Sequence, residues 1–280
     1  MLNWFDPGFR LVITEMLLLF SLAMIISSIG FFRVVYFISI GYTFSIVAMA
    51  ITTPIRHIKH LSWASATQNI LLVLWGLRLG IYLVQREFRA SYRKELSNVH
   101  QRSAEMSWVI KSLIWMSVSI LYVFMFSPSL FGLITLSGNS SWGFYLVEIA
   151  GLGLMGGGLV LEAIADKQKS DFKAQSPGQY CDTGLYSWVR CPNYLGEIIF
   201  WVGNWITGIV RYDTPLKWIA SSAGVVCIVL IMMGSTKRLE RSQDERYGDQ
   251  PKYQEYIRTV PVLFPFVPVY SLKKVRVFLE

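Results

Sequence analysis

The residues with the clearest chemistry lie in one short stretch that runs from Arg190 to Trp201. Pro192 is tolerated in the first turn of a helix because its missing N–H would have no intrahelical partner there, so we predict that a helix begins near it. Asn193, Glu197 and Trp201 would then share one helix face. A glutamate inside an apolar membrane helix needs a partner. Two interpretations follow: an ion pair with Arg190 that only holds the helix end, and a polar ligand site at the mouth of a membrane pocket.

Two further polar sets are expected at the same membrane boundary. The first contains Glu162 and Asp166, one helical turn apart, followed by Lys173. The second lies on one predicted helix and consists of Trp75, Arg78, Tyr82 and Arg86. Arginine inside a span must face protein or water. Basic side chains suit phosphates, whereas asparagine and paired carboxylates suit amide and hydroxyl groups. The three sets therefore predict a deep pocket for a large anionic cofactor, with a hydrophobic co-substrate that arrives through lipid.

The composition places these residues in a membrane protein. The chain has 280 residues, of which 53% are hydrophobic and 16% are charged, whereas about a quarter of a soluble domain is charged. The excess apolar surface must face lipid. The three cysteines have no paired spacing and the three histidines do not cluster with them, so we expect neither a disulfide framework nor a metal site.

Apolar windows of roughly 20 residues, long enough to span a bilayer, recur along the chain. The windows lie near 11–32, 34–54, 68–86, 109–128, 141–165, 195–210 and 216–234. The first contains Glu15 and has no small-residue cleavage site, so it is expected to be a retained helix rather than a signal peptide. We therefore predict an all-α integral membrane protein with about seven transmembrane helices, in a single membrane domain over 1–280.

The positive charges indicate the orientation of these spans. With seven spans, 19 Lys and Arg residues fall on one side of the membrane and 5 on the other, and the richer side is cytoplasmic by the positive-inside rule. The N-terminus is then outside and the C-terminus cytoplasmic. The same placement explains the net charge of +8 without a nucleic-acid partner. Three cytoplasmic segments, 87–107, 166–194 and 235–280, are expected to close the cofactor pocket.

Glycines are dense in the fifth window. They are Gly151, Gly153, Gly156, Gly157 and Gly158. Glycine at this density lets membrane helices approach closely, so helix packing is the first interpretation. A narrow groove for a flat ligand is the second.

One stretch matches a known family pattern. Residues 184–197 read Gly-Leu-Tyr-Ser-Trp-Val-Arg-Cys-Pro-Asn-Tyr-Leu-Gly-Glu. This resembles the signature of the membrane steroid 5-alpha-reductase superfamily, whose bacterial branch usually carries Gly-Leu-aromatic, then three residues, Arg-His-Pro-Asn-Tyr, an aromatic residue or leucine, and Gly-Glu. Residues 75–82, 166–173 and 253–265 resemble that branch as well. The resemblance extends over about residues 70–265, to 3-oxo-5-alpha-steroid 4-dehydrogenase-like proteins. It implies seven membrane helices, NADPH bound from the cytoplasm, and hydride transfer to a C=C bond conjugated to a carbonyl.

The resemblance also implies a role for each matching position. Asn193 and Glu197 would hold the nicotinamide amide, and Tyr82 would donate the proton or polarise the carbonyl. Trp75 and Trp201 would line the substrate pocket. The full set implied to bind the cofactor is Arg78, Arg86, Glu162, Asp166, Lys173, Arg190, Asn193, Tyr194, Glu197, Arg241 and Tyr247.

Two departures from the family pattern affect these roles. Cys191 replaces the histidine of the signature, which costs little where that position is structural. The steroid-reducing members pair their tyrosine with a glutamate in an early helix, whereas residues 34–54 contain no acid. Tyr42 and Glu15 could substitute, although Glu15 is expected nearer the opposite membrane face. The cofactor half of the prediction therefore has more support than the substrate half.

Two other interpretations stay open. Membrane methyltransferases that act on isoprenylcysteine or phospholipid amines bind S-adenosylmethionine and also carry an Arg-x-Pro-x-Tyr turn and a closing tail with acids, which Glu240, Tyr253 and Tyr256 fit loosely. Asn193 with Glu197 four residues later favours the reductase. A lipid- or sterol-binding relative without catalysis is the other alternative. The substrate class (a steroid, a sterol or another lipid) and the host membrane (bacterial inner membrane or endoplasmic reticulum) both stay open.

Overall fold

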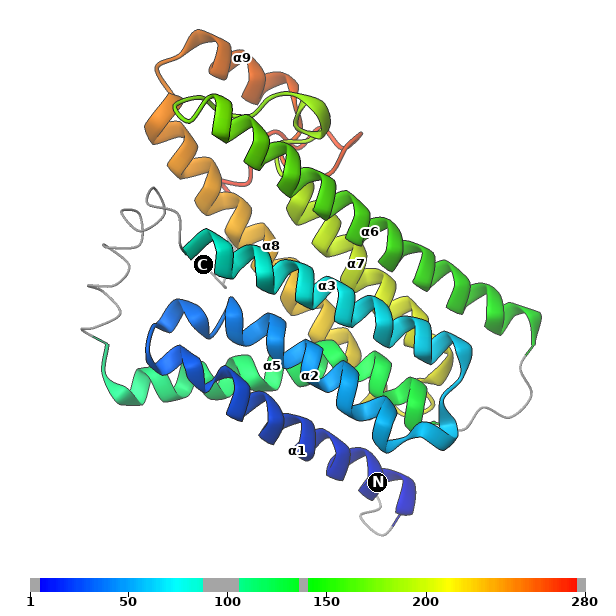
Figure 1. Cartoon of the computed structure of the whole chain (residues 1–280). Helices are drawn as coiled ribbons and strands as arrows, with labels where there is room; N and C mark the ends of the chain where they lie inside the picture. Colours follow the sequence, from blue (N-terminus) through cyan, green and yellow to red (C-terminus); the bar gives the residue numbers. More distant parts are fainter. Residues whose placement is uncertain (1–5, 88–105, 136–140, 276–280) are drawn as a thin grey trace. The chain divides into compact units, whose positions relative to one another are not determined.

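The structure is a computed structural model that describes residues 6–87, 106–135 and 141–275 (Figure 1). Every regular element within these ranges is a helix, as predicted for an all-α integral membrane protein. The predicted cytoplasmic segment 87–107 lies almost entirely outside the described residues. The last part of the segment 235–280 lies outside them too.

The helices follow the predicted windows closely. They are α1 (Pro7–Ser27), α2 (Ile40–Arg56), α3 (Trp63–Glu87), α5 (Trp108–Ile134), α6 (Trp142–Gln175), α7 (Pro192–Gly208), α8 (Pro215–Tyr247) and α9 (Pro251–Thr259). Short 3-10 segments connect several of them, namely η1 (Ser28–Phe31), η2 (Val34–Tyr36), η3 (Ile58–His60), η4 (Gly184–Ser187) and η5 (Ile209–Arg211). The last helix continues beyond its predicted window at 216–234, because α8 ends only at Tyr247.

Six helical segments of the described chain are long and apolar enough to cross a membrane. They are Pro7–Phe31, Val34–Arg56, Trp63–Glu87, Trp108–Ile134, Trp142–Gln175 and Pro215–Tyr247. The remaining predicted span, the sixth, corresponds to α7. That helix has 17 residues, slightly fewer than the roughly 20 that a straight crossing requires.

The chain separates into two compact units. Unit 1 comprises Met1–Leu152 and Trp205–Gly224, and unit 2 comprises Gly153–Asn204 and Val225–Glu280. The helices α6, α7 and α8 therefore contribute residues to both units. Within unit 1, α1, α2 and α3 follow one another in antiparallel order, and α5 packs against α1 and α2 (Figure 1).

Hydrogen bonds between small polar side chains join the helices of unit 1. The Ser27 hydroxyl lies 3.1 Å from that of Ser119, and the Ser129 hydroxyl donates to Asn69 at 3.0 Å. Such bonds are favourable where no water can replace them. At the α2–α3 contact, a side chain at Gly76 would meet the backbone of Thr43 at 3.0 Å. Small residues thus let these helices approach closely.

Large apolar side chains cover much of the outside of the helices. Examples are Leu17, Ile25, Ile70, Leu113 and Leu146, each at least 59% exposed. In water such an extensive apolar surface would drive association, whereas in a bilayer it is the surface that contacts lipid. The chain is therefore an integral membrane protein.

Glycines join α6 and α7 within unit 2. A side chain at Gly158 would lie 2.5 Å from the Phe200 amide nitrogen, and one at Gly196 would lie 2.7 Å from that of Glu162. Helix packing is therefore the role of Gly158. Side chains built at Gly153, Gly156 and Gly157 would meet nothing within 4 Å, so these glycines serve no contact between described residues.

Candidate cofactor site

The turn before α7 begins the candidate site in unit 2. The helix starts at Pro192 as predicted, and the first intrahelical bond is donated by Leu195 to the Cys191 carbonyl at 3.1 Å. Before the turn, Gly184 has a positive φ of 62°, a conformation that glycine adopts without strain. The carbonyl oxygen of the Gln168 side chain accepts the Leu185 N–H at 2.9 Å. This bond anchors the loop on the last turns of α6.

Arg190 forms a buried ion pair with Glu240 of α8. The guanidinium Nη2 lies 2.9 Å from the Glu240 Oε1, and both side chains are 3% exposed. The second carboxylate oxygen accepts the Leu272 N–H at 2.8 Å, and Arg190 Nη2 also donates to the Tyr270 carbonyl. The Arg190 backbone N–H donates to the Pro261 carbonyl at 2.9 Å. Arg190 thus ties the α7 turn to the tail, and its contact with a cofactor phosphate stays a prediction.

Asn193 presents an acceptor that the described residues do not satisfy. Its side-chain oxygen Oδ1 is buried and has no hydrogen-bond partner among them. A buried polar atom without a partner costs roughly 1–3 kcal/mol. Glu197, one turn further along the same helix, is buried as well at 6% exposure. This face of α7 therefore offers a buried acceptor beside a buried carboxylate.

The acids of α6 lie next to this face. Glu162 and Asp166 are 2% and 7% exposed. The close approach at Gly196 brings the backbone of Glu162 against α7 directly before Glu197. The helices α6 and α7 therefore meet at Glu162 and Gly196, and a pocket shared by the Glu162–Asp166 set and the Asn193–Glu197 set stays a prediction. Trp201, also predicted for the pocket, is 2% exposed on the next turn of α7.

The tail closes over the loop through a cluster of tyrosines. Tyr180, Tyr247 and Tyr253 form one buried group, and Lys173 donates to the Tyr247 hydroxyl at 3.0 Å. The Tyr256 hydroxyl donates to the Tyr186 carbonyl at 2.7 Å. Figure 1 shows α9 beside the loop that precedes α7. The predicted Lys173 and Tyr247 therefore meet, in a contact that joins the end of α6 to the end of α8.

Burial affects the pKa of two tyrosine hydroxyls in α9. It raises the pKa of Tyr253 above its usual value, and the neighbouring Asp244 carboxylate adds to the effect. Burial likewise raises the pKa of Tyr256. Tyr253 donates to Asp244 Oδ1 at 3.0 Å. At neutral pH both tyrosines are hydrogen-bond donors that fasten the tail.

Arg241 and Tyr194 complete the predicted cofactor residues of unit 2. Arg241 is exposed on α8 and Tyr194 is half-buried on the first turn of α7. Both take part in interactions with other described residues. Their contacts with a cofactor stay predictions.

The second predicted set, on α3, belongs to unit 1. Trp75 is completely buried and meets the Tyr42 ring edge-on at a centroid distance of 5.1 Å. Tyr42 also stacks on Tyr122 at 5.4 Å. Arg78, Tyr82 and Arg86 follow on one face of α3 and are partly buried. Tyr42 and Trp75, which were predicted separately as a catalytic residue and a pocket residue, are thus in contact, whereas a single pocket shared with the α6 and α7 residues stays a prediction.

Glu15 lies beside the C-terminal end of α2, whereas Tyr42 lies near the start of that helix. The Glu15 carboxylate contacts Arg56 Nη2 at 2.8 Å and His57 Nε2 at 3.3 Å. Arg56 ends α2, whereas Tyr42 is near its start, and a helix of that span rises about 21 Å. The structure therefore does not bring Glu15 to Tyr42, in agreement with its expected place near the opposite face.

A tyrosine–acid pair that the sequence did not indicate lies between η2 and α3. The Tyr36 hydroxyl is 3.2 Å from Glu87 Oε2, and Arg33 pairs with the same oxygen at 3.0 Å. Glu240, the partner of Arg190, was also missed as a site residue. Both pairs join residues at least 50 positions apart, which periodicity within one helix cannot reveal. The acids interleaved with basic residues in the tail were the one available signal for Glu240.

No group of three or more histidine, cysteine, aspartate or glutamate side chains suited to a metal ion occurs in the part of the chain that the structure describes. The charged residues of the candidate site include buried acids and the Arg190–Glu240 ion pair. This donor set suits amide, hydroxyl and phosphate groups.

Comparisons with known proteins place the chain in a family. No solved structure matches it. An uncharacterized protein of Schizosaccharomyces pombe is 29% identical to it, in a match that covers 38% of this chain and 35% of that protein. The match therefore spans about a third of the relative's length. A family model described as "Protein of unknown function (DUF1295)" matches residues 24–260, most of the chain, and the chain belongs to that family.

Proposed function

We propose that the chain is an NADPH-dependent membrane reductase of the steroid 5-alpha-reductase superfamily, which reduces the C=C bond of an enone-type steroid, sterol or other lipid. The observation that carries the proposal is the polar face of α7. There the buried Oδ1 of Asn193 has no partner among the described residues, and the buried Glu197 lies one turn away. A carboxamide offers the N–H that such an acceptor needs.

The donor set of unit 2 fits a nicotinamide cofactor. Asn193 and Glu197 would hold the carboxamide, and the acids Glu162 and Asp166 would accept bonds from ribose hydroxyls. Lys173 and the exposed Arg241 supply positive charge for phosphates. NADPH, when bound, supplies the hydride. The tail, fastened by the Arg190–Glu240 pair, would exclude water from that site.

The substrate half of the proposal rests on unit 1. Reduction of an enone develops negative charge on the carbonyl oxygen, which a nearby hydroxyl donor stabilises. Tyr82 is the proposed donor, on the helix that also carries the buried Trp75. Tyr42 packs against Trp75, and the Tyr36–Glu87 pair supplies an acid close to the end of α3. The hydrophobic substrate would arrive from lipid, and the cofactor from the cytoplasm.

Ligand titrations test the cofactor. The full-length protein in detergent is heated with NADPH, NADH or S-adenosylmethionine, because a ligand that binds only the folded state raises the unfolding midpoint. We expect NADPH to raise it and Glu197→Ala to abolish that rise. No rise with NADPH would refute the reductase. A rise that survives Glu197→Ala would instead refute the assignment of the site.

Enone reduction tests the proton donor. Tyr82→Phe should retain the NADPH-induced rise and lose most enone reduction, since the substitution removes only a hydroxyl. Unchanged turnover would move the donor role to Tyr42, which the equivalent Tyr42→Phe variant examines.

One observation favours a second candidate, an S-adenosylmethionine-dependent methyltransferase. The tail of such enzymes closes over an Arg-x-Pro-x-Tyr turn, and here Glu240 of the tail pairs with Arg190 of that turn at 2.9 Å. Tyr256 fastens the same tail to the Tyr186 carbonyl. A rise of the unfolding midpoint with S-adenosylmethionine alone would decide for this candidate. Absence of a rise with all three ligands would favour a non-catalytic lipid-binding protein.

A further inference from the structure

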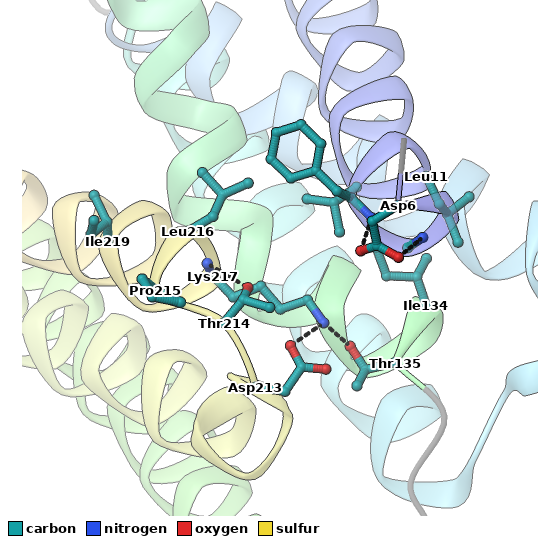
Figure 2. A pocket seen from close by; sticks show the side chains of 13 residues that line it. Asp6, Leu11, Ile134, Thr135, Asp213, Thr214, Pro215, Leu216, Lys217 and Ile219 are labelled. Atoms are coloured by element: carbon teal, nitrogen blue, oxygen red, sulfur yellow. Dashed lines mark hydrogen bonds and ion pairs between the residues drawn. The ribbon is translucent and has the colours of Figure 1, made fainter. Parts of the chain in front are cut away.

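A cavity of about 890 Å³ lies in unit 1, lined by the first turns of α1 and α8 and the end of α5 (Figure 2). Its volume is within the roughly 300–1,000 Å³ of ligand pockets. None of its lining residues belongs to the proposed cofactor or substrate sites. The cavity is therefore separate from the sites proposed above and could bind a different ligand.

One wall of the cavity carries a buried ammonium group. Lys217 is 6% exposed, and its Nζ lies 2.7 Å from Asp213 Oδ1 and 2.8 Å from Thr135 Oγ1. Figure 2 shows both contacts as dashed lines at the polar side of the cavity. They use two of the three N–H donors of the ammonium. The ammonium also lies 5.8 Å from the centroid of the Phe131 ring. Its third donor has no hydrogen-bond acceptor among the described residues, which leaves that donor for a ligand.

Carboxylates outnumber the cation around the cavity. Asp213 is 54% exposed although it pairs with Lys217. Asp6 is exposed at the start of α1, where it accepts the Gly8 and Phe9 amides at 3.4 and 3.1 Å. Each carboxylate has more acceptor positions than these contacts use. The polar part of the cavity thus offers one ammonium donor and two carboxylates.

The rest of the cavity is apolar and reaches the lipid-facing surface. Leu11 and Ile219 line it and are also 41% and 67% exposed. Ile134 and Leu216 line its interior. An occupant can therefore reach the cavity from the bilayer, with an apolar part along these side chains and a polar part at Lys217.

We propose that this cavity binds one phospholipid with a primary-amine headgroup. The phosphate accepts the remaining donor of Lys217, and the headgroup ammonium donates to Asp213 and Asp6. An acyl chain lies along Leu11 and Ile219. A purely anionic lipid would satisfy Lys217 but face the two carboxylates, and a quaternary amine has no N–H to donate. Charge complementarity therefore selects the primary amine.

Native mass spectrometry of the full-length protein in detergent measures the selectivity. Phosphatidylethanolamine, phosphatidylcholine and phosphatidylglycerol are titrated separately. The loss of one charge-assisted hydrogen bond weakens binding roughly tenfold, so phosphatidylethanolamine should bind about tenfold more tightly than either of the others. Equal binding of the three lipids, or preference for phosphatidylglycerol, overturns the proposal.

Substitutions locate the site. Lys217→Met/Asp213→Asn removes both charges together, so neither partner remains unpaired, and should abolish the preference. The matched control, Lys59→Met/Asp182→Asn, removes the same charges from exposed side chains and should leave it unchanged. A preference that survives in the first variant, or disappears in the control, contradicts the site.

A bulky residue at the cavity mouth gives an independent check. Ile219→Trp changes an exposed side chain and so should not impair folding, which circular dichroism verifies. It should lower binding of phosphatidylethanolamine severalfold by obstructing the acyl chain. Unchanged binding in this variant also rejects the cavity as the site.

Discussion

Buried charges are arranged differently in the two units. In unit 1 Arg211 pairs with Glu148 at 2.9 Å and also donates to the Thr135 carbonyl at 3.3 Å. In unit 2 the equally buried Arg190–Glu240 pair binds the tail. Close to its turn lies Asn193, whose Oδ1 has no partner among the described residues. Both pairs are structural, and we propose that the open acceptor of Asn193 receives a hydrogen bond from a ligand.

The largest effect on stability is expected at Arg190, whose ion pair with Glu240 holds the tail. Arg190→Met leaves Glu240 buried without its cation, and breaking a buried pair costs about 3–5 kcal/mol. Arg190→Met/Glu240→Met removes both charges and should recover much of that loss. Thermal unfolding in detergent measures the stability of these variants. Arg211→Met breaks the corresponding buried pair in unit 1 and serves as the comparison. A single variant as stable as the double one would show that the pair does not hold the tail.

Helix packing gives the next largest effect. Gly196→Ala places a methyl group 2.7 Å from the Glu162 amide nitrogen, and overpacking of this kind costs about 1–3 kcal/mol. Gly157→Ala adds the same methyl group where nothing lies within 4 Å, so it should change the unfolding midpoint little. Equal effects of the two substitutions would contradict the α6–α7 contact described above.

Alkaline pH probes the turn before α7. Burial raises the pKa of Cys191 to about 11 from 9.0, so the folded chain holds this proton more tightly than the unfolded chain. The contribution of the thiol to stability is therefore complete below about pH 9 and is lost as the pH rises towards 11. Wild type should lose stability more steeply over that range than Cys191→Ala. If the stability of wild type and of Cys191→Ala changed equally with pH, the Cys191 thiol would be exposed to water in the folded protein.

The smallest change in stability is expected at Asn193. Asn193→Ala removes an acceptor that has no partner among the described residues, so the unfolding midpoint without ligand should stay within about 0.5 kcal/mol of wild type or rise. A large loss of stability would mean that the amide is a structural residue. The unfolding midpoints of Asn193→Ala and Arg190→Met therefore distinguish a ligand-binding residue from a structural residue in the same turn.

Most of the fold could be predicted from apolar windows, and much less of the site could. The start of α7 at Pro192 and the shared face of Asn193 and Glu197 follow from local spacing, because proline and helical periodicity act within a few residues. The pairing of Arg190 with Glu240 spans 50 residues, and the spacing of residues within one helix carries no information about such a contact. For the same reason the Tyr36–Glu87 pair could not be predicted.

The length of the helices shows the same limit. The fifth window was predicted to end at 165, yet α6 continues to Gln175. Its polar last turns lie beyond the apolar stretch. They are held by Leu185 of the loop, through Gln168, and by Tyr247 at the end of α8, through Lys173. Hydropathy indicates where the apolar stretch ends and not where the helix ends. The C-terminal end of α6 therefore depends on tertiary contacts.

The most direct test of the proposed site is the NADPH-induced rise of the unfolding midpoint in wild type and in Asn193→Ala. Ligand at a hundred times its dissociation constant should stabilise wild type by about 2.7 kcal/mol. Asn193→Ala, equally stable without ligand, should lose most of that gain, while Arg211→Met should keep its own rise with NADPH. Equal stabilisation of wild type and Asn193→Ala, or stabilisation by S-adenosylmethionine alone, would contradict the account.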